Sequence, residues 1–242
     1  MTSPFVQKLR HGACLTEEDA LLLDQLARPV HVAQAHHDIL MEGDPPHTLT
    51  LILEGWACRY KQLDDGRRQI IALFLPGDLC EPYGILPHFM DHSLGAITAI
   101  RYARIRPDEM RALARANARI EEALWWDMLL QSAMQHEQTV SFGRRLAAER
   151  LAHFICELRL RLALVGLADE TGFELPLIQS QLADAMGLTA VHINRTLMEL
   201  RAAGLIELQR KQLTIRDPEA LRNLAVFDPV YFHLDQRKDC NG

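Results

Sequence analysis

The sequence predicts an α+β protein with an N-terminal antiparallel β-roll, a long helix, and a C-terminal helix-turn-helix followed by a hairpin. Three observations predict this class. Turn signals centred on glycine recur at intervals of 12, 11 and 11 residues, at Gly43, Gly55, Gly66 and Gly77. From Pro107 onward the composition changes to strong helix formers. Near the C-terminus, two short helical patterns flank a single glycine, as in a helix-turn-helix.

The N-terminal part consists of short β-prone runs between these turns. The runs are rich in leucine, isoleucine and aromatic residues, and apolar and polar positions partly alternate in them. They cover Asp38 to Met41, Leu49 to Leu53, Trp56 to Gln62, and Arg68 to Leu75. Evenly spaced short strands with glycine turns are typical of an antiparallel roll or barrel and disfavour β-α-β units. We therefore expect a β-roll over residues 1–118.

The middle of the chain predicts a long amphipathic helix. Apolar residues recur near a 3.6-residue spacing from Arg119 to Val140, a segment about 33 Å long if fully helical. Residues 141–143 interrupt the pattern, and a second helix is expected from Ala147 to Val165. The apolar stripe of the long helix includes Ile120, Leu130 and Met134. The roll has too little surface to cover a stripe of this length, so we expect residues 119–143 to form a dimerisation helix and hinge.

The C-terminal part, residues 144–242, carries the strongest motif. Gln179 to Met186 is short and helical, and Gly187 supplies a turn residue that reverses the chain. Thr189 is a natural N-cap for a second helix that Gly204 ends. This arrangement leaves the start and the outward face of the second helix free, which is where a recognition helix meets the edges of bases.

A small hairpin, the wing, is predicted after the second helix, from Leu205 to Leu208 and from Gln212 to Ile215. Residues 187–216 hold five basic residues against Glu199 and Glu207. These are Arg195, Arg201, Arg210, Lys211 and Arg216. Because the whole chain has a net charge of −6, it does not have the basic character of a protein that coats nucleic acid non-specifically. The local basic patch therefore predicts contact with double-stranded DNA.

Taken in order, these features resemble the Crp/Fnr superfamily of transcription regulators from about residue 20 to 225. The turns E-G-D, L-I-L-E-G and L-P-G-D-L resemble the family's effector domain, a cyclic-nucleotide-binding-like roll. Residues 144–155, R-R-L-A-A-E-R-L-A-H-F-I, resemble the hinge and post-hinge helix of the Fnr/FixK branch. The resemblance implies a homodimer joined along residues 119–140, with one recognition helix per subunit in a major groove. It also implies a sequence-specific regulator that acts on a palindromic site, with RNA polymerase as a further partner.

The helix-turn-helix and the wing supply the expected DNA-binding residues. These are Gln179, Ser180, Thr189, Ala190, Val191, His192, Asn194, Arg195 and Lys211. Arg195 is the expected base reader, because an arginine that bonds guanine through two hydrogen bonds is the commonest specific contact. Fnr-like proteins commonly present a glutamate where this chain has Val191, a residue that instead suits the methyl group of a thymine. Lys211, in the wing, is expected to contact phosphate.

The effector domain departs from its cyclic-nucleotide-binding relatives. Those proteins hold the nucleotide phosphate with an arginine, and this chain has no arginine between Arg68 and Arg101. Of the clustered N-terminal cysteines of oxygen sensors only Cys14 is present, so an iron–sulfur cluster is not expected. We expect no cofactor, no cyclic AMP binding, and an unidentified effector, if any. The candidate effector-binding residues are Arg68, Glu81, Tyr83, His92, Ser93 and Trp126.

Two other classes of function stay open at this stage. A cupin-like metal-dependent enzyme is disfavoured because His36 and His37 are adjacent on a predicted strand and point to opposite faces, and no H-x-H motif occurs. No catalytic motif and no metal site are therefore expected. A β-roll interaction module without DNA binding is disfavoured by the intact helix-turn-helix. The chain shows no secretory signal and no apolar run long enough to cross a membrane, so we expect a cytoplasmic protein without a membrane partner.

Overall fold

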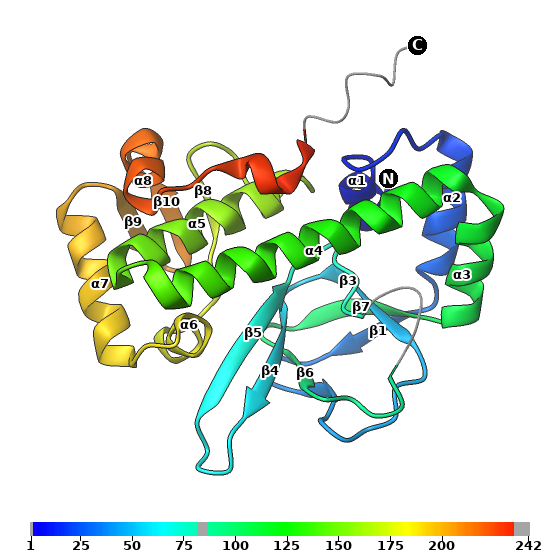
Figure 1. Ribbon diagram of the computed structural model, residues 1–242, viewed down its shortest axis with the longest axis horizontal. Coiled ribbons are helices and arrows are strands. Elements are labelled where there is room, and N and C mark those ends of the chain that lie inside the picture. The colour runs from blue at the N-terminus through cyan, green and yellow to red at the C-terminus, as the bar shows by residue number, and fades with distance from the viewer. Residues whose placement is uncertain (1, 82–86, 235–242) are drawn as a thin grey trace. The chain divides into compact units, whose positions relative to one another are not determined.

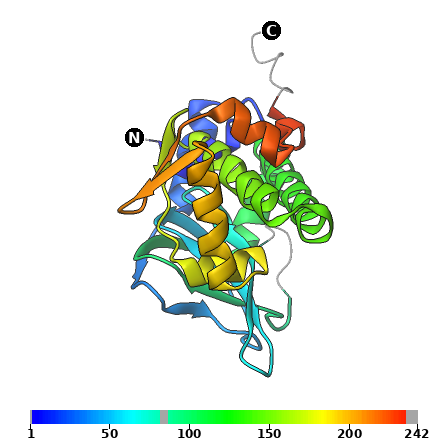
Figure 2. The same ribbon diagram turned by 90° about the vertical axis from the view of Figure 1, so that its left-hand side faces the viewer.

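The computed structural model describes residues 2–81 and 87–234 (Figure 1). The elements up to residue 144 are α1 (Pro4–Leu9), α2 (Glu17–Leu26), β1 (Val30–Ala33), β2 (Asp38–Leu40), β3 (Leu49–Glu54), β4 (Ala57–Gln62), β5 (Arg68–Phe74), β6 (Ser93–Ala96), β7 (Ile100–Ile105), α3 (Pro107–Ala116) and α4 (Ala118–Arg144). The later ones, which face the viewer in Figure 2, are α5 (Ala147–Ala163), β8 (Gly172–Glu174), α6 (Gln179–Met186), α7 (Ala190–Ala202), β9 (Ile206–Gln209), β10 (Gln212–Ile215), α8 (Pro218–Ala225) and a final 3-10 turn (Pro229–Phe232).

The chain forms two compact units. Of the described residues, 2–61, 71–81, 87–132 and 232–234 belong to the first unit, and 62–70 and 133–231 to the second. The division falls inside α4, so this helix contributes to both units. No helix in the described part of the chain is long and apolar enough to cross a membrane.

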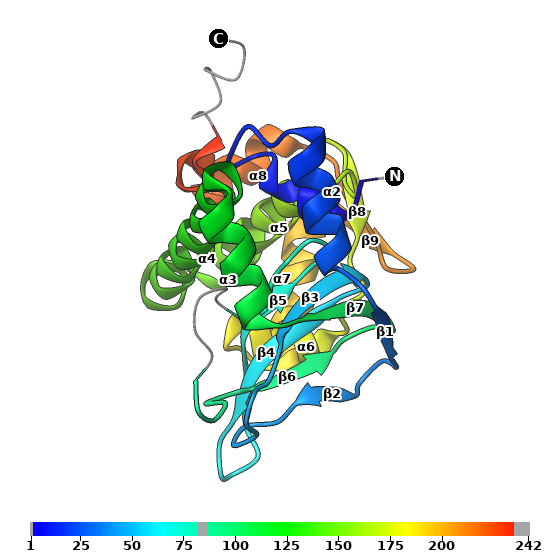
Figure 3. The ribbon, with the colours of Figure 1, turned by 90° about the vertical axis from the view of Figure 1, so that its right-hand side faces the viewer.

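The first unit contains the antiparallel roll except for residues 62–70 of the β4–β5 hairpin, which belong to the second unit (Figure 3). One sheet has the strand order β1-β7-β3, and the other has the order β2-β6-β4-β5. The four predicted strands are confirmed as β2, β3, β4 and β5, each with ends within one residue of the expected ones. The sequence did not predict β1, β6, β7 or α1. Ala103 in β7 pairs with Val30 in β1 on one side and with Leu51 in β3 on the other, so β7 is the central strand of its sheet.

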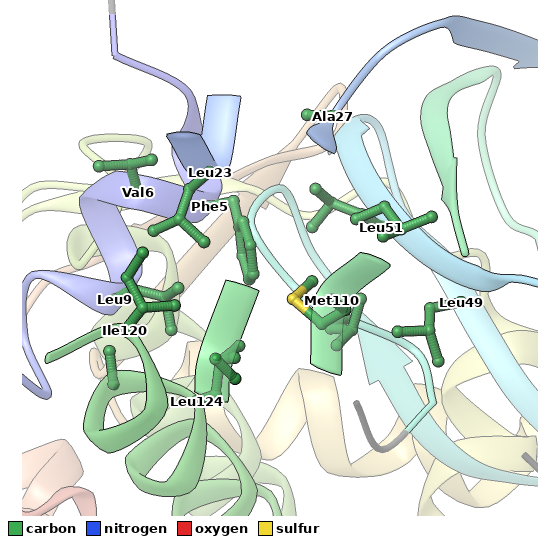
Figure 4. Packing of buried hydrophobic residues seen from close by; sticks show 14 of the residues in the cluster. Phe5, Val6, Leu9, Leu23, Ala27, Leu49, Leu51, Met110, Ile120 and Leu124 are labelled. Carbon is green, nitrogen blue, oxygen red and sulfur yellow. The ribbon is translucent and has the colours of Figure 1, made fainter. Parts of the chain in front are cut away.

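A hydrophobic core joins the helices of this unit to the roll (Figure 4). Phe5, Val6 and Leu9 of α1 are fully buried in it, together with Leu23 of α2 and Met110 of α3. Strand β3 and helix α4 complete the same cluster with Leu49, Leu51, Ile120 and Leu124. The N-terminal helix has only six residues, and such a short helix is marginal by itself. Its stability therefore comes from this packing.

Helix α4 is longer than expected and exposes a different face (Figure 1). It runs without interruption through Gly143 to Arg144, where the sequence predicted a break at residues 141–143. The predicted stripe was also wrong, because Ile120 and Leu130 are 0% and 1% exposed within the first unit itself. The apolar side chains that stay exposed on α4 are Trp125, Leu129, Val140 and Phe142.

The second unit contains the helix-turn-helix and its wing (Figure 2). The wing is a three-stranded sheet in the order β8-β10-β9, and the sequence did not predict its first strand. Helix α6 has the predicted bounds, and α5, α7, β9 and β10 begin and end within two residues of the predicted positions. Inside this unit Leu151 and Ile155 of α5, Ile193 and Leu200 of α7, and Leu213 of β10 are at most 1% exposed.

Candidate nucleic-acid interface

The turn between α6 and α7 has the geometry that the sequence predicted. Gly187 adopts a left-handed conformation, with φ +63°, and caps α6 by donating its N–H to the carbonyl of Ala183. Residues other than glycine rarely adopt this conformation. Two residues later Thr189 caps α7, since its hydroxyl accepts the N–H of His192 at 3.2 Å. Two local signals therefore fix where the second helix begins.

The two faces of α7 differ as a recognition helix requires. The inner face is formed by Ile193, Thr196, Leu197 and Leu200, all of which are at most 3% exposed. The start and the outward face carry the exposed residues Thr189, Ala190, Val191, Asn194 and Arg195, with His192 half-buried. Val191 is 81% exposed, so its side chain is accessible to a partner.

The polar side chains of this surface contact one another. A guanidinium nitrogen of Arg195 lies 3.2 Å from Nε2 of His192, one turn before it. Nε of Arg195 lies 3.6 Å from Glu199, one turn after it. At the start of α6, the exposed Gln179 donates its amide to Asn194 at 3.4 Å, and Ser180 is exposed beside it. The structure thus brings the predicted residues of α6 and α7 together on one polar surface.

The wing tip holds the remaining predicted residue. Arg210 and Lys211 link β9 to β10 with φ values of +48° and +70°. Two-residue hairpin turns of this kind favour Asn-Gly, because side chains other than those of asparagine, aspartate and glycine are strained at positive φ. The turn therefore keeps two exposed cations at its tip at a conformational cost.

The basic patch is smaller than the sequence count suggested. Arg216 pairs with Glu207, and Arg201 donates to the carbonyl of Leu208 at 3.1 Å. Arg210 and Lys211 have no ion-pair partner within 4 Å among the described residues. Positive charge is therefore available at the wing tip and at Arg195, whose charge Glu199 partly balances.

Three of the effector candidates lie near Arg59, because its charge acts on both Glu81 and His92, and Ser93, the first residue of β6, follows His92. Glu81 is 3% exposed and accepts the N–H of Thr50 at 2.6 Å, and burial raises the pKa of its carboxyl to about 7. Ser93 accepts the N–H of Glu42 at 3.0 Å. Trp126 is also buried, with its ring packed so closely on Gly12 that a Cβ there would clash. Tyr83 lies outside the described residues. Glu81, Ser93 and Trp126 are each at most 8% exposed.

Two further effector candidates, Arg68 and His92, each lie beside an aspartate. Arg68 belongs to the second unit, where its Nε lies 4.0 Å from the carboxylate of Asp184. His92 is paired with Asp91 at 2.6 Å, and burial, followed by the charge of Arg59, lowers its pKa.

Arg59 is a cation close to the effector candidates Glu81 and His92 that the sequence did not identify. Its guanidinium donates to the carbonyl of Cys80 and lies 5.3 Å from the centre of the Phe74 ring. Its charge also favours the ionised form of Glu81. The sequence gives no signal for it, because Lys61, Arg67 and Arg68 on the same predicted hairpin have the same chemistry. No group of three or more histidine, cysteine or acidic residues able to hold a metal ion occurs in the described ranges.

Comparison with known proteins identifies both parts of the chain. Residues 30–117 match the model of a cyclic nucleotide-binding domain, and residues 149–224 match that of a Crp-like helix-turn-helix domain. The nitrogen fixation regulation protein FixK of Bradyrhizobium diazoefficiens is 30% identical over 230 residues, which cover 90% of this chain and 91% of that protein. The transcriptional activatory protein AadR of Rhodopseudomonas palustris is 31% identical over 196 residues, 77% of each chain. The solved structure of FixK2 from Bradyrhizobium japonicum matches with a TM-score of 0.72 and 25% identity, over 83% of this chain and 98% of that one.

Proposed function

The chain belongs to the Crp/Fnr family of DNA-binding transcription regulators, and we propose that it binds a palindromic site as a homodimer and reads each half-site with α7. Its relatives are regulators rather than enzymes, so the metal-dependent enzyme considered as an alternative is set aside. The helix-turn-helix match likewise sets aside an interaction module without DNA binding. The observation that carries the proposal is the exposed start of α7, where Val191, Asn194 and Arg195 project beside the N-terminus of α6.

Arg195 is the base reader in this proposal. It stands on the outward face of α7, within its first two turns, and the residues near the start of a recognition helix contact base edges. Arginine matches the two acceptors of guanine in the major groove. Val191 lies one turn earlier on the same face and is suited to contact a thymine methyl group. Gln179, Ser180, Thr189, Ala190, His192 and Asn194 complete the contact surface.

The wing tip anchors the complex on the DNA backbone. Lys211 is exposed and has no ion-pair partner among the described residues, so its charge can neutralise a phosphate. Such contacts add affinity without sequence preference and make binding depend on salt. Arg210, next to it, provides a second cation at the same place, although the sequence analysis did not select it.

Helix α4 supplies the proposed dimer surface. Trp125, Leu129 and Val140 recur at helical spacing and are 56%, 47% and 45% exposed. Apolar side chains in a row on an exposed helix are covered in most proteins by another helix. A second copy of this chain is the occupant that the family implies. With α4 in this role, residues 1–118 are the proposed effector domain, residues 119–143 the dimerisation helix and hinge, and residues 144–242 the DNA-binding domain.

The remaining parts of the proposal concern partners and control. RNA polymerase is the proposed protein partner, and one relative is named as a transcriptional activator. The cytoplasm is the proposed location. The roll is the proposed site of an unidentified effector, and cyclic AMP is not expected to serve, because the chain lacks an arginine between Arg68 and Arg101.

The test is selection of bound sequences from random DNA with the purified chain. We expect two inverted half-sites about one DNA turn, roughly 34 Å, apart. Arg195→Ala should then cost roughly 1 to 3 kcal/mol of binding free energy and flatten the preference at one base pair. Arg195→Lys is the matched control, because it keeps the charge but loses the two-bond match to guanine. It should restore affinity without restoring the preference.

Lys211→Ala should weaken binding to all sequences about equally and reduce the salt slope by roughly one unit. Val191→Glu restores the residue common in Fnr-like proteins and should shift the preference toward a TTGAT-like half-site. Recovery of random sequences in the selection contradicts the proposal. If Arg195→Ala keeps the sequence preference while Lys211→Ala abolishes it, the reader and the anchor are reversed.

A further inference from the structure

The segment that follows α8 lies beyond the residues that match the helix-turn-helix family model, which end at 224. Val226 adopts φ +47° and ends α8, and Phe227 donates its N–H to the carbonyl of Arg222, so the chain turns back. In Figures 1 and 2 this red segment then runs beside α5. We call residues 227–231 the strap.

Two aromatic side chains of the strap enclose a histidine of α5. The ring of Tyr231 is stacked on His153, with centroids 6.2 Å apart and planes 13° apart. Phe227 meets His153 edge-on at 5.2 Å and Tyr231 at 6.0 Å. Such ring pairs add stabilisation beyond the area they bury. The hydroxyl of Tyr231 also donates to the carboxylate of Glu157, one turn further along α5, at 3.0 Å. The strap is thus fixed to α5 by both packing and a hydrogen bond.

The enclosed histidine faces the end of α4. His153 is 4% exposed, and Nε2 lies 3.4 Å from the carboxylate of Glu137. Burial, and then the charge of Arg145, lowers the pKa of His153 to about 4, so the imidazole is uncharged at neutral pH. An uncharged, tightly enclosed ring acts as a packing element between the two helices.

Glu137 is also bound to the hinge between these helices. Arg145, the first residue after α4, donates to the Glu137 carboxylate at 2.7 Å, to the Glu137 carbonyl at 3.2 Å, and to the hydroxyl of Ser141 at 2.8 Å. The carboxylate of Glu137 on α4 therefore contacts both Arg145 of the hinge and His153 of α5. Covering His153 with the strap holds this group together.

Hydrogen bonds from α5 fix the position of α6, the first helix of the helix-turn-helix, relative to α5. Arg150 on α5 donates to the carbonyl of Met186, the last residue of α6, at 2.7 Å. The same side chain donates to the carbonyl of Phe142 in the last turn of α4 and to the carbonyl of Arg145 in the hinge, both at 3.3 Å. The angle between α4 and α5 therefore also sets the angle between α4 and α6.

We propose that the strap is a positioning element that fixes the angle between α4 and α5, and thereby the spacing of the two half-sites that a dimer accepts. Helix α5 has 17 residues and is about 25 Å long. Because α6 and α7 turn with α5, a rotation of about 10° at the hinge would move a point one α5 length away from it by about 4 Å, slightly more than the roughly 3.4 Å rise of one base pair. A loose hinge would therefore tolerate half-sites one base pair closer together or further apart. This inference rests on the proposed function.

The experiment measures binding to DNA duplexes whose half-sites are separated by the selected spacer, by one base pair more, or by one base pair fewer. The test variant is Phe227→Ala combined with Tyr231→Ala. Val230→Ala is the matched control, because Val230 is on the same turn but 69% exposed. A duplex with a single half-site reports the reading by α7 alone, and circular dichroism reports folding.

The wild-type chain and Val230→Ala should prefer the selected spacer by about tenfold, which corresponds to about 1.4 kcal/mol. The double variant should lose most of this preference while its affinity for a single half-site stays unchanged. Equal loss of affinity for every duplex, or an unchanged spacer preference in the folded double variant, overturns the inference.

Failure of the proposed function gives a different result, because the wild-type chain itself would then show no spacer preference. If the double variant does not fold, Tyr231→Phe replaces it, since it keeps the stacked ring and removes only the hydroxyl bonded to Glu157. A reduced spacer preference in Tyr231→Phe supports the inference, and an unchanged one overturns it.

Discussion

Lys8 is the best place to test how the first unit is held together. It is 4% exposed, and Nζ lies 2.5 Å from a carboxylate oxygen of both Asp78 and Asp127. Asp78 also accepts the N–H of Leu75, and Asp127 accepts the amide of Gln131. One ammonium group therefore joins α1 to a turn of the roll and to α4. Lys8→Met leaves two carboxylates buried without a cation.

The expected loss of unfolding free energy is about 3 to 5 kcal/mol, because breaking a buried ion pair leaves an uncompensated charge. This is a large share of the roughly 5 to 15 kcal/mol that stabilises a typical domain. Lys61→Met is the matched control. Lys61 pairs with Glu42 at 3.0 Å, but its side chain is 47% exposed, so its loss should stay below about 1 kcal/mol.

Urea unfolding followed by tryptophan fluorescence measures both variants. All three tryptophans, Trp56, Trp125 and Trp126, belong to the first unit, so the signal reports this unit. Burial lowers the pKa of Lys8, but Asp127 and Asp78 outweigh it and raise the pKa above 10.5. The stabilisation is therefore complete below pH 10.5 and is lost only as the pH rises further. A Lys8→Met loss no greater than that of Lys61→Met, or one that varies between pH 7 and 9, would refute this reasoning.

Leu129→Glu should convert the proposed dimer to a monomer in sedimentation at micromolar concentration, because Leu129 is exposed on α4. Leu130→Glu should instead unfold the first unit, because Leu130 is buried. A dimeric Leu129→Glu chain contradicts the interface. Saturating cyclic AMP should give no heat in calorimetry, and a micromolar Kd would show that another residue, such as Arg68 or His92, replaces the missing arginine. A hydrogen bond from Arg119 lowers the pKa of Asp19, so its stabilisation is present above about pH 4 and is lost as the pH falls. Asp19→Asn should therefore be less stable at pH 7 and less sensitive to acid.

Local chemistry explains why so much of the helix-turn-helix was predictable. Gly187 and Thr189 fix the ends of α6 and α7 through their own backbone preferences and hydrogen bonds, so the turn needed no knowledge of distant residues. Periodicity then separated Ile193 from Arg195, the first buried and the second exposed. The glycine turns located four strands of the roll in the same way. The wing-tip residues followed from the hairpin pattern.

The fold class, the helix-turn-helix and its outward residues could be predicted without a structure, because they depend on interactions between residues close in the chain. Which face of α4 is covered depends on tertiary packing, since Leu129 and Leu130 have the same chemistry and differ only in what packs against them. Tertiary packing also decided that Lys8 is buried between two aspartates and that Tyr231 reaches Glu157, 74 residues away. Contacts between residues so far apart leave no periodic or local signal, because they depend on how the complete chain packs.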